Sequence, residues 1–133
     1  MDDEVELLRA PALTDTVPYA YAAASGRLVL TAGACPLDER GEVTALGDVA
    51  GQAALVMANL TAALAAAGCR LSDVLKTTVY VASPDRADLV AVWDVVRAAF
   101  GDHDAPSTLL GVAVLGYPGQ LVEVEAVAVR SGP

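Results

Sequence analysis

The sequence has little of what metal sites and nucleic-acid surfaces require. It holds only two cysteines, Cys35 and Cys69, with no CxxC pair, and a single histidine, His103. These are too few for the usual Cys/His metal site, so we expect no metal and no cofactor. Eight Lys and Arg residues stand against 17 Asp and Glu residues, which gives a net charge of −9. This balance disfavours binding to nucleic acid or to an anionic membrane.

The sequence also lacks an uninterrupted apolar run long enough to span a bilayer. Its acidic start, MDDEVELLR, resembles neither a signal peptide nor a basic transit peptide. We therefore expect a cytoplasmic protein with reduced thiols. The length of 133 residues suits a single domain over 1–133. Apolar residues are abundant and make up 55% of the chain. This fraction suggests that some apolar surface is buried between protomers, and hence that the protein is an oligomer.

Periodicity and breaker residues predict the order β-β-β-α-β-α-β-β. Asp48 is a good N-cap for the first helix, and Gly68 a good C-terminal stop. Ser83, followed by Pro and Asp, predicts the start of the second helix, which Gly101 ends. The predicted segments are strands within 4–8, 12–26 and 27–32, a helix over 48–67, a strand over 74–81, a helix over 83–100, and strands over 108–115 and 121–129.

The stretch from 108 to 129 is predicted to be a hairpin, with its turn at Tyr117-Pro118-Gly119. In its second strand Glu123 and Glu125 share one face, because strand side chains alternate between faces. A pair of carboxylates in an apolar strand either lines a solvated face or places one acid in a cleft, where it handles a water or a proton.

Two helices can cover only one face of a six-stranded sheet. The segments VLKTTVYV, STLLGVAVL and QLVEVEAVAV nevertheless carry apolar residues on both faces. The uncovered face therefore needs a partner, most simply copies of the same chain.

These features, taken in order, resemble the reactive intermediate deaminase family, RidA/YjgF. The resemblance runs from about Pro18 to Arg130. The segments that carry it are Pro18-Tyr19, LVLTAG (28–33), Gly47-Asp48, Gln52, Asn59-Leu60, LSDVLKTTVY (71–80), Phe100-Gly101, Ser107-Thr108 and LVEVEAVA (121–128).

The resemblance implies an α/β fold of the chorismate-mutase-like type and a homotrimer with a small-molecule ligand cleft at each subunit interface. In active members it implies hydrolysis of enamines and imines to a 2-keto acid and ammonia. Glu123 matches the acid that holds the hydrolytic water, and Tyr19 and Gly33 match cleft positions. For Glu123 the alternative is an interface carboxylate satisfied by backbone N–H groups.

The chain departs from the family at the residue that grips the substrate carboxylate. The family motif Pro-Ala-Arg-Ser reads Asp104-Ala105-Pro106-Ser107 here, so Pro106 stands where the Arg is expected. Ser107 and Thr108 could offer hydroxyl or backbone groups to a ligand, or could simply begin a strand. Trp93 stands at a position often held by Asn and is expected in the core.

Three functions follow as hypotheses. The first is a deaminase-type hydrolase of small imines, enamines or related carbonyl derivatives, with a substrate preference altered by Pro106. The second is a non-catalytic trimer that binds or senses a small ligand. The third is a ribonuclease-like translation inhibitor, an activity attributed to some relatives, which the acidic charge disfavours.

Overall fold

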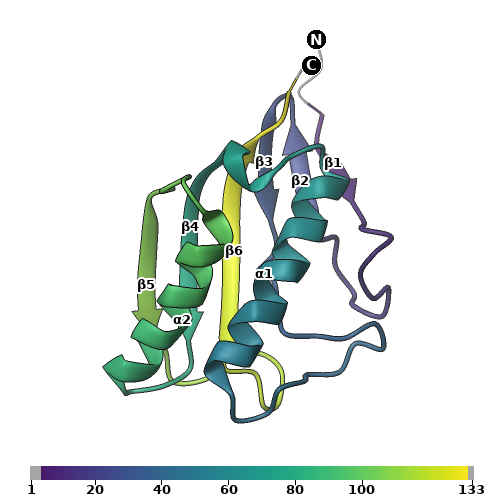
Figure 1. The fold of residues 1–133 in the computed structure, drawn as a ribbon. Coiled ribbons are helices and arrows are strands. Elements are labelled where there is room, and N and C mark those ends of the chain that lie inside the picture. Colours follow the sequence, from purple (N-terminus) through teal and green to yellow (C-terminus); the bar gives the residue numbers. More distant parts are fainter. Residues whose placement is uncertain (1–3, 132–133) are drawn as a thin grey trace.

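The computed structural model describes residues 4–131 and consists of one sheet covered by two helices (Figure 1). Its elements are β1 (Glu6–Leu8), β2 (Ala22–Ser25), β3 (Leu28–Thr31), α1 (Val49–Ala66), the 3-10 turn η1 (Leu71–Asp73), β4 (Val74–Val81), α2 (Arg86–Phe100), β5 (Ser107–Gly111) and β6 (Val122–Val129). The strands lie in the order β1-β2-β3-β6-β4-β5. The predicted order of elements and the six-stranded mixed sheet are thus confirmed.

The predicted hairpin over 108–129 is wrong, because β4 lies between β5 and β6. β4 pairs with β5 in parallel and with β6 in antiparallel orientation. A parallel neighbour needs a crossover, and α2 supplies it between β4 and β5. β5 ends at Gly111, so residues 112–121 form a loop. Within that loop Gly119 has φ 82°, which fits the predicted turn.

The helix ends follow from capping. Asp48 caps α1 as predicted, and its Oδ1 accepts the Gly51 N–H at 2.9 Å. Gly68, with φ 81°, follows the end of α1. For α2 the predicted cap was wrong: Asp85, rather than Ser83, is the N-cap. Asp85 caps the helix because its Oδ1 accepts the Ala87 N–H at 2.9 Å.

The helix-covered face of the sheet forms the core. Side chains of β6 alternate, so that Val122, Val124, Ala126 and Ala128 are buried against the helices. Among the described helices, α1 is the one that is long and apolar enough to cross a membrane. The sequence pattern did not predict a membrane-spanning segment there. α1 is instead the core helix, because its side chains pack into the same buried cluster as the sheet.

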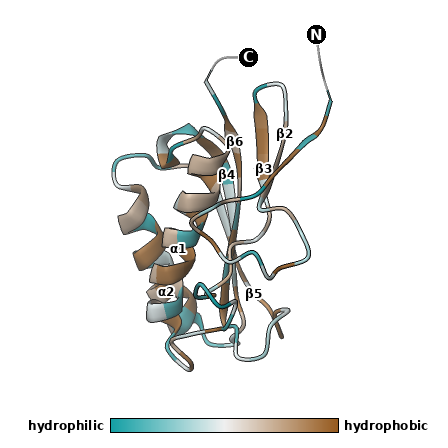
Figure 2. Ribbon diagram, turned by 90° about the vertical axis from the view of Figure 1, so that its right-hand side faces the viewer, coloured by the Kyte–Doolittle hydropathy of each residue, from teal (hydrophilic) through white to brown (hydrophobic). Residues whose placement is uncertain are grey.

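The opposite face of the sheet is uncovered in a single chain. Figure 2 shows the sheet nearly edge-on, with both helices on one side. Leu28 and Leu30 on β3 are 46% and 48% exposed on the open side. In β6 the residues Val127 and Val129 stand opposite them and share this face. The expected apolar, unpartnered face is therefore present at the β3–β6 half of the sheet.

Candidate functional site

Glu123 is the second residue of β6 and points to the open side of the sheet. It is half-buried, and its strand neighbours Val122 and Val124 face the helices. Across the sheet it stands opposite Tyr80 of β4. Its position is fixed by the alternation of β6, which the sequence predicted.

Gly33 makes room for the Glu123 side chain. A Cβ atom added at Gly33 would lie only 2.2 Å from Glu123 Oε2 and 2.5 Å from its carboxyl carbon. No residue with a side chain fits there unless Glu123 moves. The sequence resemblance placed both residues in one cleft, and the structure brings them into direct contact.

One oxygen of Glu123 is held by two donors that sequence reasoning did not assign. Gln120 Nε2 donates to Oε1 at 3.1 Å, and the Cys35 thiol lies 3.5 Å from the same oxygen. Gln120 is only 3% exposed and also binds the Val122 carbonyl and the Tyr117 N–H. Among the described residues no hydrogen bond reaches Oε2. The carboxylate therefore has one anchored oxygen and one open oxygen.

The thiol of Cys35 stays protonated in this setting. Burial, followed by the nearby Glu123 carboxylate, raises the pKa of Cys35 to about 12. Its sulfur lies 3.3 Å from the Gly33 carbonyl oxygen and 3.5 Å from Glu123 Oε1, so the thiol can donate to either acceptor. Cys35 is thus a weak hydrogen-bond donor rather than a nucleophile at neutral pH.

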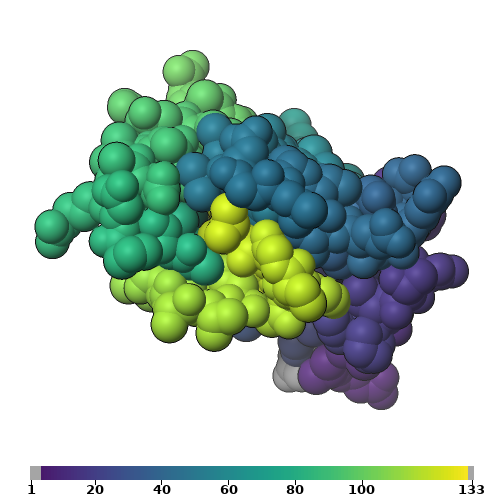
Figure 3. All heavy atoms as spheres, turned by 90° about the horizontal axis from the view of Figure 1, so that it is seen from below, coloured from purple at the N-terminus to yellow at the C-terminus, as the bar shows by residue number. Residues whose placement is uncertain are grey.

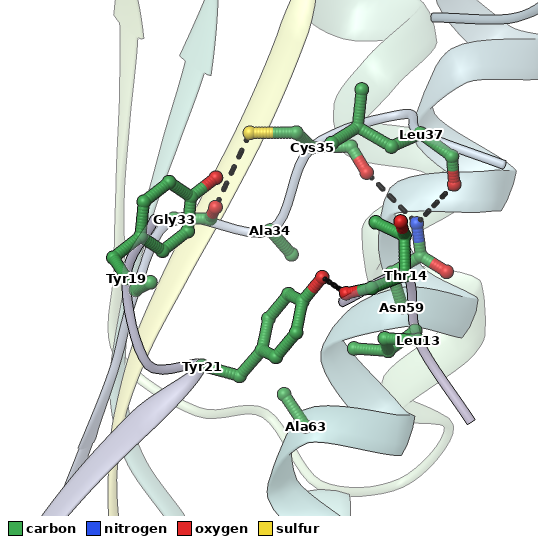
Figure 4. A pocket seen from close by; sticks show the side chains of 11 residues that line it. Leu13, Thr14, Tyr19, Tyr21, Gly33, Ala34, Cys35, Leu37, Asn59 and Ala63 are labelled. Atoms are coloured by element: carbon green, nitrogen blue, oxygen red, sulfur yellow. Dashed lines mark hydrogen bonds between the residues drawn. The ribbon is translucent and has the colours of Figure 1, made fainter. Parts of the chain in front are cut away.

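Two amides on α1 hold the loops around Glu123. Gln52, fully buried, donates to the Gly119 carbonyl at 2.9 Å and accepts the Leu121 N–H at 2.7 Å. Figure 3 shows the loop before β6, in yellow-green, beside the blue residues that begin α1. Asn59 donates to the carbonyls of Cys35 and Leu37 at 2.9 and 3.0 Å, as Figure 4 shows.

Tyr19 lies beside Gly33 and Cys35 on the wall of a small, mainly apolar pocket (Figure 4). Its hydroxyl pairs with that of Tyr117 at 2.9 Å. Burial and this hydrogen bond raise the pKa of the Tyr19 phenol well above its usual range. The phenol therefore remains a neutral donor. Tyr19 and Gly33 line this pocket together, and Gly33 in turn lies against the Glu123 side chain.

The other predicted site residues lie elsewhere. The Pro106 carbonyl accepts the Thr77 N–H at 3.0 Å, and Ser107 Oγ lies 2.5 Å from Thr77 Oγ1 on the helix side. Thr108 accepts from Lys76 Nζ at 2.6 Å on the open side. β5 is two strands from β6, and Leu110, not Thr108, aligns with Glu123. Strand spacing then separates Thr108 from Glu123 by roughly 10 Å across the sheet and about 7 Å along it.

A second pocket lies beside Ser107, between the end of α2 and the loop that leads to β5. Its lining includes Trp93, Arg97, Phe100 and His103. Trp93 is half-buried and packs against the core, and His103 Nε2 lies 2.8 Å from the Val74 carbonyl oxygen. Sequence reasoning missed Arg97, although its spacing of four residues from Trp93 places both on one helix face.

The Glu123 group can bind and orient a water molecule. A carboxylate with one fixed and one open oxygen accepts a proton at the open oxygen, and neighbouring neutral donors can bind an uncharged polar group. Within residues 4–131 no cluster of three or more His, Cys, Asp or Glu side chains could hold a metal ion. The residues of this group thus support acid–base chemistry.

Comparisons with known proteins agree with this architecture. The family model described as Endoribonuclease L-PSP matches residues 9–130. A 2-iminobutanoate/2-iminopropanoate deaminase of Escherichia coli K12 is 36% identical over 116 residues, which cover 85% of this chain and 88% of that protein. The crystal structure of the E. coli YjgF gene product has TM-score 0.81 and 32% identity, covering 94% and 98% of the two chains. E. coli TdcF with bound serine also has TM-score 0.81, with 30% identity and 95% and 99% coverage.

Proposed function

Because the chain belongs to the endoribonuclease L-PSP family, the RidA/YjgF family of its sequence resemblance, we propose that it hydrolyses small imines or enamines to carbonyl compounds and ammonia. The observation that carries this proposal is the carboxylate of Glu123, with Oε1 anchored by Gln120 and Oε2 open above Gly33. The E. coli relative named as an imine deaminase supports the same reaction class.

In the proposed mechanism Glu123 acts as a general base and then as a general acid. Oε2 takes a proton from water as the water oxygen attacks the imine carbon and the C=N π bond breaks toward nitrogen. Glu123 returns the proton to nitrogen. Oε2 then takes the proton of the new hydroxyl and delivers it to the nitrogen as the C–N bond breaks, so the hydroxyl becomes a carbonyl and ammonia leaves. The sum is imine plus water giving carbonyl and ammonia, with no oxidant, metal or cofactor required.

The substrate cleft is proposed to form between subunits of a cytoplasmic homotrimer of single-domain chains. The open sheet face, with Leu28 and Leu30 exposed, supports association of this kind. The separation of Glu123 from Pro106 and Thr108 within one chain supports it too, because a second copy could bring the two regions together. Light scattering on the purified protein tests the trimer: a monomer at micromolar concentration would contradict it.

The direct test mixes the protein with freshly generated 2-iminopropanoate and follows release of the keto acid. We expect a rate above buffer that is lost in Glu123→Gln. A wild-type rate equal to buffer would overturn the proposal for 2-imino acids. An imine without a carboxylate, formed from an aldehyde and ammonia, is the companion substrate, because Pro106 offers no cation to a carboxylate.

One observation favours a second function, a non-catalytic trimer that binds a small ligand. Pro106 carries neither a charge nor an N–H at the position that the resemblance assigns to substrate binding. A metabolite that raises the melting temperature without being consumed would support this alternative. A ribonuclease is disfavoured, because a net charge of −9 repels RNA.

A further inference from the structure

The pocket beside α2, here called the Trp93 pocket, has preformed walls. It is lined by Trp93, Arg97, Phe100, His103, Asp104, Ala105 and Ser107. The Val74 carbonyl accepts from His103 Nε2 at 2.8 Å, so the ring proton sits on Nε2. The His103 ring lies 6.2 Å from that of Phe100, at 37°. These contacts fix the loop wall before any ligand arrives.

The hydroxyl of Ser107 is already engaged and offers the pocket little hydrogen bonding. It binds Thr77 Oγ1 at 2.5 Å and donates to the Ala105 carbonyl at 3.1 Å. The polar side-chain atoms that remain include His103 Nδ1, an acceptor while Nε2 carries the proton, and two charged groups. Arg97 and Asp104 both line the pocket, and neither has an ion-pair partner among residues 4–131.

The combination of charges and rings selects a ligand class. Trp93 and Phe100 line the pocket, and aromatic side chains of this kind favour contact with an aromatic group. Arg97 can bind a carboxylate, and Asp104 an ammonium group. A simple anion is disfavoured by Asp104 and by the net charge of −9, whereas a zwitterion carries no net charge.

We propose that the Trp93 pocket is a binding site for an aromatic α-amino acid. The carboxylate pairs with Arg97, the ammonium with Asp104, and the side-chain ring packs against Trp93 and Phe100. Glu123, on the far side of β4, takes no part in this binding. The site is additional to the proposed imine hydrolysis, and its test does not depend on turnover.

Trp93 is the only tryptophan of the chain, so its fluorescence reports on this pocket. Titration of the wild-type protein with L-phenylalanine should change the emission of Trp93 in a saturable way. L-alanine lacks the ring, 3-phenylpropanoate lacks the ammonium, and phenethylamine lacks the carboxylate. We expect each to bind about tenfold more weakly, since each loses one group of contacts.

Two arginines of α2 provide a matched pair of variants. Arg97→Gln should weaken L-phenylalanine binding about tenfold. Arg86→Gln should leave it unchanged, because Arg86 lies about 16 Å away at the start of the helix. Both side chains are exposed, and circular dichroism confirms folding of each variant.

Three results would overturn the proposal. The first is the absence of a saturable change with L-phenylalanine. The second is equal binding of L-phenylalanine and L-alanine, and the third is tighter binding of 3-phenylpropanoate than of L-phenylalanine, which would indicate an anion site. The ligand series uses wild-type protein, so it stands even if a variant misfolds. No readout involves turnover, and a failure here leaves the imine proposal untouched.

Discussion

Glu123 and Arg97 are two charged groups in opposite settings. One oxygen of Glu123 is fixed by Gln120 and lies close to the Cys35 thiol. The carboxylate also packs so closely on Gly33 that a side chain at position 33 would not fit. Arg97 is exposed on α2 and has no ion-pair partner among the described residues. A prearranged group suits chemistry, because little reorganisation is needed during reaction. A free guanidinium on a preformed pocket suits capture of a ligand.

The largest effect is expected for Glu123→Gln. Loss of the acid–base group should lower the rate of imine hydrolysis about 10²–10⁴-fold. The matched control is Glu125→Gln, which changes the next carboxylate on the same face of β6 and should leave the rate near that of the wild type. Steady-state kinetics of both variants measure the difference. Equal rates for the two variants would remove Glu123 from the proposed mechanism.

The second effect concerns the contact between Gly33 and Glu123. Gly33→Ala puts a methyl group on the carboxylate, so Glu123 must move, and a shift of about 1 Å can cost on the order of 10²-fold in rate. Gly116→Ala is the control, because a Cβ there meets nothing within 4 Å. Rates and melting temperatures of both variants test this. An active Gly33→Ala enzyme would show that the close contact is dispensable.

The third prediction separates two buried glutamines that bind the same loop. Gln52→Met and Gln120→Met should each destabilise the fold by about 1–3 kcal/mol, since each leaves buried groups unpaired. Of these two glutamines, Gln120 is the one that hydrogen-bonds to Glu123. Gln120→Met should therefore also lower kcat, by about tenfold, whereas Gln52→Met should not. Urea unfolding and kinetics are measured together. A parallel fall of kcat in both variants would make Gln120 a purely structural residue.

The last effect is confined to alkaline pH and is absent at neutral pH, where the enzyme assays are run. The pKa of Cys35 rises from 9.0 to about 12 in the folded chain, so between these values the folded state retains a proton that the unfolded state has lost. Stability should therefore fall as pH rises from 9, by at most about 1.4 kcal/mol per pH unit from this group. Cys35→Ala should flatten that slope in urea unfolding series. An unchanged slope would mean that Cys35 ionises normally.

Local signals predicted the elements well. Asp48 and Gly68 marked the ends of α1 because capping depends on neighbouring residues in the chain. The alternation along β6 gave the side to which Glu123 points. The hairpin prediction was wrong because it relied on a local signal as well. β5 and β6 are adjacent in sequence, but β4 lies between them in the sheet.

The site was predictable only in part. The grouping of Tyr19, Gly33 and Glu123 came from family resemblance, whereas the roles of Gln120 and Cys35 depend on tertiary contacts. The Cys35–Glu123 contact joins residues 88 positions apart, and no local pattern encodes such a distance. Arg97 was not predicted because it lies outside the apolar stripe of α2, which carries the helical signal.

The central place of β6 has a consequence for synthesis on the ribosome. β6 follows every other described element in sequence, yet it pairs with both β3 and β4 in the middle of the sheet. Until residues 122–129 emerge, two strand edges lack their partner and the nascent sheet stays in two parts. Such open edges invite pairing between chains. Truncation before residue 122 would therefore yield an aggregating product rather than a smaller folded one.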